Sequence, residues 1–419
     1  MSRHDERSER GTLMDSQGKG RFRTELSHTD ERENPLLTQR SPSLLQVCLG
    51  FLLVMQGVPI PAGGGSVPLS ELAALAFLTL ALFRRPERQL SRFGVVGVLA
   101  VALILYLIGV TIINDGDWLR RAFRIAMLLG LIGVFASGRV DIRAALRGAV
   151  AALAINIPLF YLGLLPDTYG GVLTGFIGDK NVAGLYYAVV PLLLSATCSS
   201  NKYKVALLVF GAAGTVLTDS RTSMAALACA IIWVVASPKL GMFFRMVLFG
   251  GFIIAIQYIE ENFARALVYA ERVGSDRLRE QIDRQSWEKV GDTPWYGSGL
   301  NQAFVIIEDR HWWFHNSYWG LWVEGGAIFC VVVVLAYIIL GLRPFSTVFR
   351  SRSRIAVEGA AIVLLVCASR LGETFITVPG ALLLACGLML TAEEMRLRDQ
   401  RAYQLKVERV QELNPGMRL

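Results

Sequence analysis

Charge, cysteine and histidine are all scarce in this chain. Only 18% of its 419 residues are charged and 53% are hydrophobic, with six cysteines and four histidines. The cysteines lie in apolar stretches without metal-ligand spacing, where a thiol packs as a small apolar group. A phosphate-binding glycine loop and an HExxH sequence are both missing, which disfavours an ATP-driven transporter and a zinc protease. We expect no metal and no cofactor.

Long apolar runs are abundant instead. Runs of about sixteen to twenty-five residues, separated by short polar breaks, are typical of helices that cross a membrane. They predict an all-α polytopic membrane protein with about twelve transmembrane helices. The candidate spans are residues 43–58, 67–83, 93–113, 122–137, 144–165, 181–198, 203–218, 222–236, 241–258, 317–341, 354–371 and 376–391.

Positive charge lies mainly in alternate short connections between these spans. Because cytoplasmic loops of membrane proteins carry the excess of Lys and Arg, both termini are predicted to be cytoplasmic. The net charge of +8 therefore indicates topology, and no nucleic-acid partner is expected. The connections concerned hold Arg84, Arg85, Arg88 and Arg92; Arg139, Arg143 and Arg147; Lys202 and Lys204; Lys239 and Arg245; and Arg343, Arg350, Arg352 and Arg354.

This topology divides the chain into tails, membrane segments and one loop. Residues 1–42 are rich in both signs of charge and nearly neutral, so a disordered cytoplasmic tail is expected. Spans one to nine fill residues 43–258, and residues 259–316 form one large loop on the outer side. The last three spans fill residues 317–391, and residues 392–419 form a second cytoplasmic tail.

The large loop leads into the sequence RHWWFHNSYWGLWVEGG, residues 310–326. His311 and His315 are the only histidines outside the N-terminal tail, and His315 is a candidate general base because imidazole titrates near neutral pH. Asn316 or Ser317 would cap the helix that follows. Six of the eight tryptophans lie in or just after this loop; they favour a membrane-interface belt, and a platform for sugar rings stays open.

Basic residues also occur in the other outer connections, against the positive-inside bias. A basic residue in the first turn of a helix adds its charge to free backbone N–H groups, which together suit a phosphate or pyrophosphate. Pairing of each basic group with a nearby carboxylate, such as Asp219 or Glu373, is the alternative. The outer candidates are Arg124, Lys180, Asn181, Arg221 and Arg370.

Residues 275–290 of the large loop have the spacing of an amphipathic helix. A serine precedes the apolar positions, and Gly291 and Pro294 end the pattern. Such a helix would lie on the membrane domain and hold three basic side chains near its outer mouth. These are Arg277, Arg279 and Arg284.

These motifs together resemble those of the O-antigen ligase and O-antigen polymerase superfamily, including exopolysaccharide repeat-unit polymerases. The likeness rests on DSRTS at residues 219–223, GDKN at residues 178–181, and a loop with SDR and DTPWYGSG that leads into HNSY and EGG. The resemblance implies a fold like the GT-C membrane glycosyltransferases, with no nucleotide sugar and no metal. It also implies transfer of a glycan from undecaprenyl pyrophosphate to a hydroxyl on the outer face of the cytoplasmic membrane.

The resemblance assigns His315 as the base and Arg221 and Arg277 as residues that hold the pyrophosphate. Arginine suits this task because its planar fork binds phosphate oxygens in pairs and stays charged. The loop is compact for the family, so a simplified acceptor site is expected. Arg124 and Lys180 complete the predicted pyrophosphate site, and supporting roles are predicted for Asn181, Asp219, Asn316, Glu324 and Arg370.

The sequence leaves the acceptor open. A repeat-unit polymerase and a ligase share donor and mechanism, and a protein-directed oligosaccharide transferase is a third form. The expected partners are an undecaprenyl-pyrophosphate-linked glycan donor, a glycan or lipid acceptor, the bilayer of the bacterial cytoplasmic membrane and other polysaccharide-export proteins. A secondary transporter or flippase for an anionic solute is the alternative from another class, and it predicts ionisable residues and broken helices in mid-span.

Overall fold

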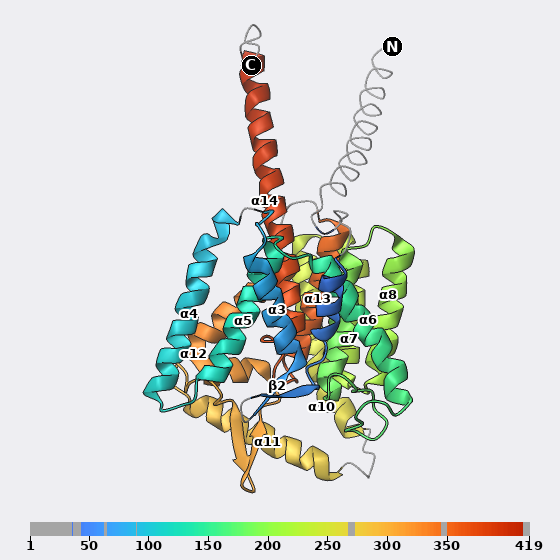
Figure 1. Cartoon of the computed structure of the whole chain (residues 1–419), viewed down its shortest axis with the longest axis vertical. Helices are drawn as coiled ribbons and strands as arrows, with labels where there is room; N and C mark the ends of the chain where they lie inside the picture. The colour runs from blue at the N-terminus through green and yellow to red at the C-terminus, as the bar shows by residue number, and fades with distance from the viewer. Residues whose placement is uncertain are drawn as a thin grey trace, which may run out of the picture.

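The computed structural model describes Leu36 and residues 43–62, 65–88, 90–266, 273–344 and 350–413. The predicted disorder of residues 1–42 lies outside the described residues, apart from Leu36. The described part is a bundle of helices with two small antiparallel hairpins (Figure 1). The all-α prediction is therefore right in the main, and it missed both hairpins.

The helices and strands follow one another closely along the chain. The strands are β1 (Pro59–Ala62), β2 (Gly65–Pro68), β3 (Phe304–Ile307) and β4 (Arg310–Trp313), paired β1 with β2 and β3 with β4. The helices are α2 (Leu44–Leu52), α3 (Leu69–Leu82), α4 (Gly94–Ile113), α5 (Leu119–Ala136), α6 (Ile142–Tyr161), α7 (Lys180–Ala196), α8 (Asn201–Leu217), α9 (Arg221–Ala236), α10 (Met242–Ala266), α11 (Val273–Asp292), α12 (Ser317–Ala336), α13 (Arg352–Cys367) and α14 (Val378–Leu413). Short turns are η1 (Ser91–Phe93), η2 (Ser237–Lys239) and the π-helical η4 (Tyr337–Leu342).

Every predicted apolar stretch overlaps one α-helix. The stretches correspond in order to α2–α10 and α12–α14, and α11 is the expected amphipathic helix. Among the described residues, five helices are long and apolar enough to cross a membrane. Helix α2 has only nine residues, which is about 14 Å and much less than the hydrocarbon core. The apolar helices indicate a membrane-embedded protein. The described helices that are long enough to cross a membrane are fewer than the twelve predicted. The five segments are Gly94–Ile113, Ile142–Tyr161, Arg221–Lys239, Ser317–Leu342 and Val378–Val407.

Helices α7 and α13 form the centre of the bundle. All of α13 from Ser353 to Cys367 is buried, as is α7 from Ala183 to Ala196. Helix α4 is the opposite case, since it is almost entirely apolar yet only 17% of it is buried inside the protein. An apolar helix that stays exposed is suited to face lipid, because lipid chains are as apolar as its own side chains.

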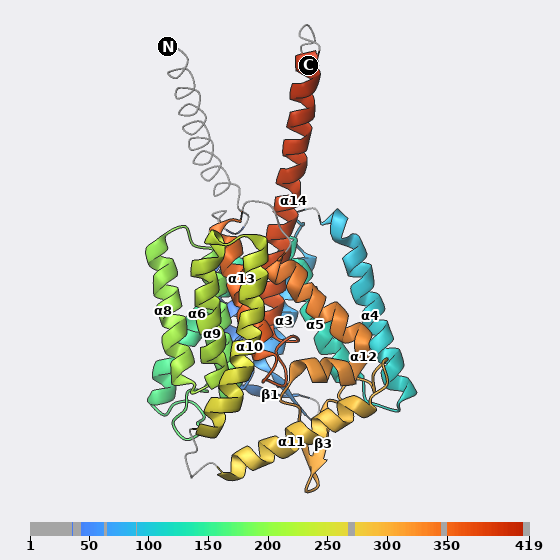
Figure 2. The same ribbon diagram turned by 180° about the vertical axis from the view of Figure 1, so that it is seen from behind.

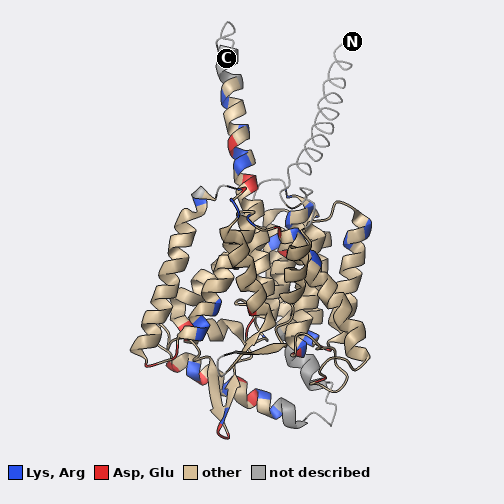
Figure 3. Ribbon diagram, in the orientation of Figure 1, with Lys and Arg blue, Asp and Glu red and all other residues tan. Residues whose placement is uncertain are grey.

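Helix α11 and the β3–β4 hairpin lie across one end of the bundle, and the C-terminal half of α14 extends beyond the other end (Figures 1 and 2). Charged residues gather toward these two ends and leave the middle of the bundle mostly uncharged (Figure 3). The segment predicted as a second tail therefore begins as a direct continuation of the last helix. Its many Glu, Arg, Leu, Gln and Lys residues favour helix without forming an apolar span.

Helix α12 is broken at Gly325–Gly326. Gly326 has φ 63° and ψ −161°, a region of backbone conformation that is open almost only to glycine. The break lets residues 295–299 pack against the helix: the amide of Ala327 donates to the carbonyl oxygen of Trp295 at 2.7 Å, and that of Ser298 donates to Val323 O at 2.7 Å. The EGG motif, residues 324–326, thus coincides with a kink in α12 against which residues 295–299 pack.

Gly326→Ala is expected to destabilise the fold by about 3 kcal/mol, because the conformation is strained for alanine. An added Cβ would also come within 1.9 Å of the carbonyl oxygen of Trp295. Gly320→Ala in the same helix is the control, since its Cβ would meet nothing closer than 3.7 Å. Thermal unfolding of both variants in detergent checks this, and an unchanged midpoint for Gly326→Ala would contradict it.

Candidate functional site

A pocket of about 840 Å³ opens at the end of the bundle that α11 covers. Its wall includes six basic and four acidic side chains, so positive charge is in excess by two. Apolar residues of α5, α12 and the start of α14 also line it. The basic residues are Arg120, Arg121, Arg124, Lys180, Arg279 and Arg370; the acidic residues are Glu71, Asp179, Glu324 and Glu373.

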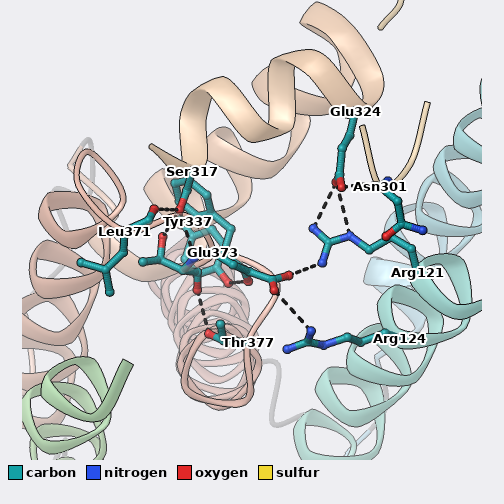
Figure 4. A network of polar contacts seen from close by, with 11 residues as sticks. Arg121, Arg124, Asn301, Ser317, Glu324, Tyr337, Leu371, Glu373 and Thr377 are labelled. Atoms are coloured by element: carbon teal, nitrogen blue, oxygen red, sulfur yellow. Dashed lines mark hydrogen bonds and ion pairs between the residues drawn. The ribbon is translucent and has the colours of Figure 1, made fainter. Parts of the chain in front are cut away.

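Arg121 is the centre of an ion-pair network in this pocket (Figure 4). Its Nη2 lies 3.1 Å from Glu324 Oε2, and its Nη1 donates a short hydrogen bond to Glu373 Oε1. Arg124 Nη1 lies 3.2 Å from the other carboxylate oxygen of Glu373. The Glu324 side chain is 3% exposed, and its Oε1 accepts from the amide of Asn301 at 3.2 Å. The network therefore joins α5, the broken helix α12 and the α13–α14 connection.

Local geometry explains why these groups meet. Arg121 and Arg124 are three residues apart on α5, so they share one helix face. Ser317 at the start of α12 fixes the α13–α14 connection, because its Oγ donates to Leu371 O at 2.6 Å and accepts from the amide of Thr374 at 3.0 Å. Glu373 is held between Ser317 and the arginines by these bonds.

Glu373 should make stability depend on pH in the acid range. Burial alone would raise the pKa of its carboxyl group, but Arg121 and Arg124 outweigh burial and hold the pKa below its usual 4.5. A carboxyl group with a lowered pKa stabilises the fold above its unfolded pKa, and this contribution is lost as pH falls through the folded pKa. We expect Glu373→Gln to lower the unfolding midpoint fully above about pH 5.5 and progressively less below about pH 4. A difference that stays constant down to pH 3 would contradict this.

His315 lies on the wall of the same pocket. Its Nδ1 is 3.3 Å from Asp283 Oδ1 on α11, and its side chain is 34% exposed. The next residue, Asn316, caps α12, since its Oδ1 accepts from the amides of Tyr318 and Trp319 at 2.9 and 3.3 Å. Asn316 thus has the predicted capping role and does not line the pocket.

The starts of α7 and α9 meet beside the pocket. Asp179 caps α7 by accepting from the amides of Asn181 and Val182. Lys180 Nζ lies 3.7 Å from Asp219 Oδ2, and Ser220 Oγ, at the start of α9, donates to Asn181 Oδ1 at 3.3 Å. Lys180 therefore has the carboxylate partner that the sequence left as an alternative.

Tyr169 lines the pocket on the side of α7. Its hydroxyl donates to Asp179 Oδ2 at 2.7 Å. Burial, together with this carboxylate, raises the pKa of Tyr169 to about 12. The phenol stays protonated near neutral pH and is a neutral hydrogen-bonding group of the wall.

The structure brings together some of the predicted site residues and leaves others outside. His315, Arg124, Lys180, Asn181, Glu324 and Arg370 line the pocket. Arg221 is the exposed first residue of α9, Arg277 is exposed on α11, and neither lines the pocket. Asp219 also lies off the wall, and its ion pair with Lys180 connects it to the site.

Among the residues that the sequence did not assign to the site, three make the ion pairs of Arg124, Glu324 and His315. Arg121 could have been found, because it stands three positions before Arg124 and therefore shares its helix face. Glu373 was considered only as a partner for an arginine. Asp283 gave no signal, since nothing in the spacing of an amphipathic helix tells which of its carboxylates faces a residue 32 positions later.

Metal binding finds no support in the part of the chain that the structure describes, where no three His, Cys, Asp or Glu side chains form a candidate metal site. Comparison of the chain with protein-family models, with curated proteins and with solved structures finds no match. The function is therefore argued from the pocket and its chemistry.

Proposed function

We propose that the chain is a membrane glycosyltransferase of the O-antigen ligase and polymerase type. It would move an undecaprenyl-pyrophosphate-linked glycan to an acceptor hydroxyl, in the synthesis of a surface polysaccharide. The observation that supports this most is that His315 shares one pocket with six basic side chains. A base beside an excess of positive charge is what transfer from a pyrophosphate requires.

The proposed reaction breaks one bond and forms one. The acceptor oxygen attacks the anomeric carbon of the donor, and the bond from that carbon to the phosphate oxygen breaks. The hydroxyl proton passes to His315, and lipid pyrophosphate leaves with the bonding electron pair. General-base catalysis contributes about 10²–10⁴-fold, and positive groups that stabilise the leaving charge contribute a similar factor or more.

Apolar residues on the pocket wall support a lipid-linked donor. Met127, Leu128, Leu321, Phe375 and Ile376 line the same pocket as the arginines. The first isoprenoid units of a lipid pyrophosphate would lie on such a wall and bury more apolar surface there than a soluble sugar nucleotide could. The mixed wall therefore favours a ligand with a charged head and an apolar chain.

The proposal places the pocket on the outer face of the bacterial cytoplasmic membrane, with both termini cytoplasmic and twelve helices in a GT-C-like arrangement. The apolar helices and the gathering of charge at the two ends of the bundle support it (Figure 3). Donor and acceptor would reach the pocket from the lipid and from the outer compartment. Other polysaccharide-export proteins are proposed partners.

Donor recognition can be tested with purified protein in detergent. Labelled undecaprenyl-pyrophosphate-linked glycan should bind, and inorganic pyrophosphate should compete with it. Arg124→Ala should weaken both ligands about 10–100-fold, the usual effect of losing a hydrogen bond to a charged group. Lys202→Ala is the control, because Lys202 is exposed at the start of α8, beyond the opposite end of α7. Equal binding by Arg124→Ala and wild type would count against the site.

Transport of an anionic solute is the second candidate function, and one observation favours it. Helix α12 is broken beside the buried pair of Glu324 and Arg121, and broken helices with buried charges occur at substrate sites of secondary transporters. Protein in liposomes separates the two functions. Uptake of a labelled sugar phosphate without any new glycosidic bond would favour transport.

A further inference from the structure

We infer that Asp283 is the positioning residue for His315, holding the imidazole with Nδ1–H toward α11 and the Nε2 lone pair toward the pocket. The inference rests on the proposed function and adds a residue to its machinery. His315 is on the pocket wall, whereas Asp283 is not. Asp283 therefore contacts the ring on the side away from the pocket and touches no reacting atom.

The contact between the two side chains fixes the roles of the ring nitrogens. Asp283 Oδ1 lies 3.3 Å from His315 Nδ1. An ionised carboxylate can only accept hydrogen bonds, and a neutral imidazole has one donor and one acceptor nitrogen. The nitrogen facing Asp283 must then carry the hydrogen, which leaves Nε2 as the only basic atom of the ring. That is the tautomer a base needs if the acceptor hydroxyl approaches from the pocket.

Packing holds both partners in place. Each of them directly follows a residue that is only 2% exposed, namely Ile282 before Asp283 and Phe314 before His315. Ile282 and Phe314 belong to one apolar cluster that joins α11, the β3–β4 hairpin and the first half of α12. The buried contact between their neighbours thus fixes the positions of Asp283 and His315 relative to each other. The cluster consists of Ile282, Val305, Ile307, Phe314 and Val323.

Hydrogen bonds on both sides add to this support. On α11, Lys289 Nζ donates to Phe304 O at 2.8 Å and lies 4.5 Å from the centre of the Phe304 ring. On the histidine side, Asn316 caps α12 and the amide of Ser317 donates to Ala368 O at 2.8 Å. Both backbone segments are therefore anchored near the pair, and the His315 ring makes a polar contact with Asp283.

The tautomer can be measured without any substrate. Protein labelled with ¹⁵N-histidine contains four histidines, and the signal that disappears in His315→Gln identifies His315. We expect the neutral ring to be mainly the Nδ1–H form in wild type, and to lose this preference in Asp283→Asn, whose amide can either accept or donate. A neutral ring mainly in the Nε2–H form in wild type, or the same tautomer in both proteins, would overturn the inference.

The kinetics of glycan transfer give a second test of the inference. Asp283→Asn should lower the single-turnover transfer rate about 10–100-fold with KM nearly unchanged, since a wrong tautomer removes the base and leaves the binding groups in place. Asp283→Glu should recover part of the rate. Glu288→Gln, which removes an exposed carboxylate of the same helix, should behave as wild type. An unchanged rate in a folded Asp283→Asn would overturn the inference. If wild type transfers no glycan, the proposed function fails, and the tautomer measurement still decides whether Asp283 orients the ring.

Discussion

His315→Ala is expected to lower the rate of glycan transfer by about 10²–10⁴-fold, the range that general-base catalysis contributes. The loss should appear in the rate constant of the chemical step and not in donor binding, because the basic groups that would hold the pyrophosphate are separate side chains. Single-turnover transfer by purified protein, with donor binding measured in parallel, checks both parts.

His311→Ala is the matched control for that variant. His311 is exposed on β4, stacks on the ring of Phe304 at 4.5 Å and is absent from the pocket wall. It should retain nearly full transfer activity. Full activity in His315→Ala would remove the imidazole from the chemistry, and equal losses in both variants would indicate damage to the hairpin instead of loss of a base.

Arg121→Ala is expected to destabilise the fold by about 3–5 kcal/mol. Removing one partner of a buried ion pair leaves the other charge buried without compensation, and Arg121 compensates two carboxylates at once. Its own side chain is 16% exposed, and that of Glu324 is 3% exposed. The midpoint of thermal unfolding in detergent, or retention of a single peak in gel filtration, measures the effect.

Arg120→Ala provides the comparison for the same helix turn. Arg120 is exposed, and its hydrogen bond to Ser66 O is long, at 3.4 Å. Its removal should change stability by no more than about 0.5 kcal/mol, as for most surface substitutions. If Arg121→Ala were as stable as Arg120→Ala, the network would not hold α5, α12 and the α13–α14 connection together.

The helices were predictable because each apolar stretch carries its own signal. The positions of α7 and α12 follow from capping residues and from the length of the apolar runs that come after them. The two hairpins were missed for local reasons. The β1–β2 segment is rich in proline and glycine, and β3 and β4 are each only four residues long, so neither pattern resembles an ordinary strand.

The contacts of the site were less predictable than its residues. Sequence indicates at which end of the bundle a residue lies, and this was enough to place His315, Arg124 and Lys180 near one another. It does not give positions within the membrane plane, so it could not tell that Arg221 and Arg277, both predicted to bind pyrophosphate, do not line the pocket that holds His315. The bond between Arg121 and Glu324 joins residues 203 positions apart, and Glu324 directly precedes the break at Gly325–Gly326.

The most direct test of the central claim is single-turnover transfer by wild-type protein in detergent, where no membrane separates two compartments and transport cannot give a product. Undecaprenyl-pyrophosphate-linked repeat units are supplied with excess enzyme and with glycan or lipid acceptors. Our account predicts a new glycosidic bond and free lipid pyrophosphate in equal amounts, with a ladder of products from a polymerase and a single product from a ligase. Intact donor after incubation with every acceptor, from protein that binds the donor, would contradict it.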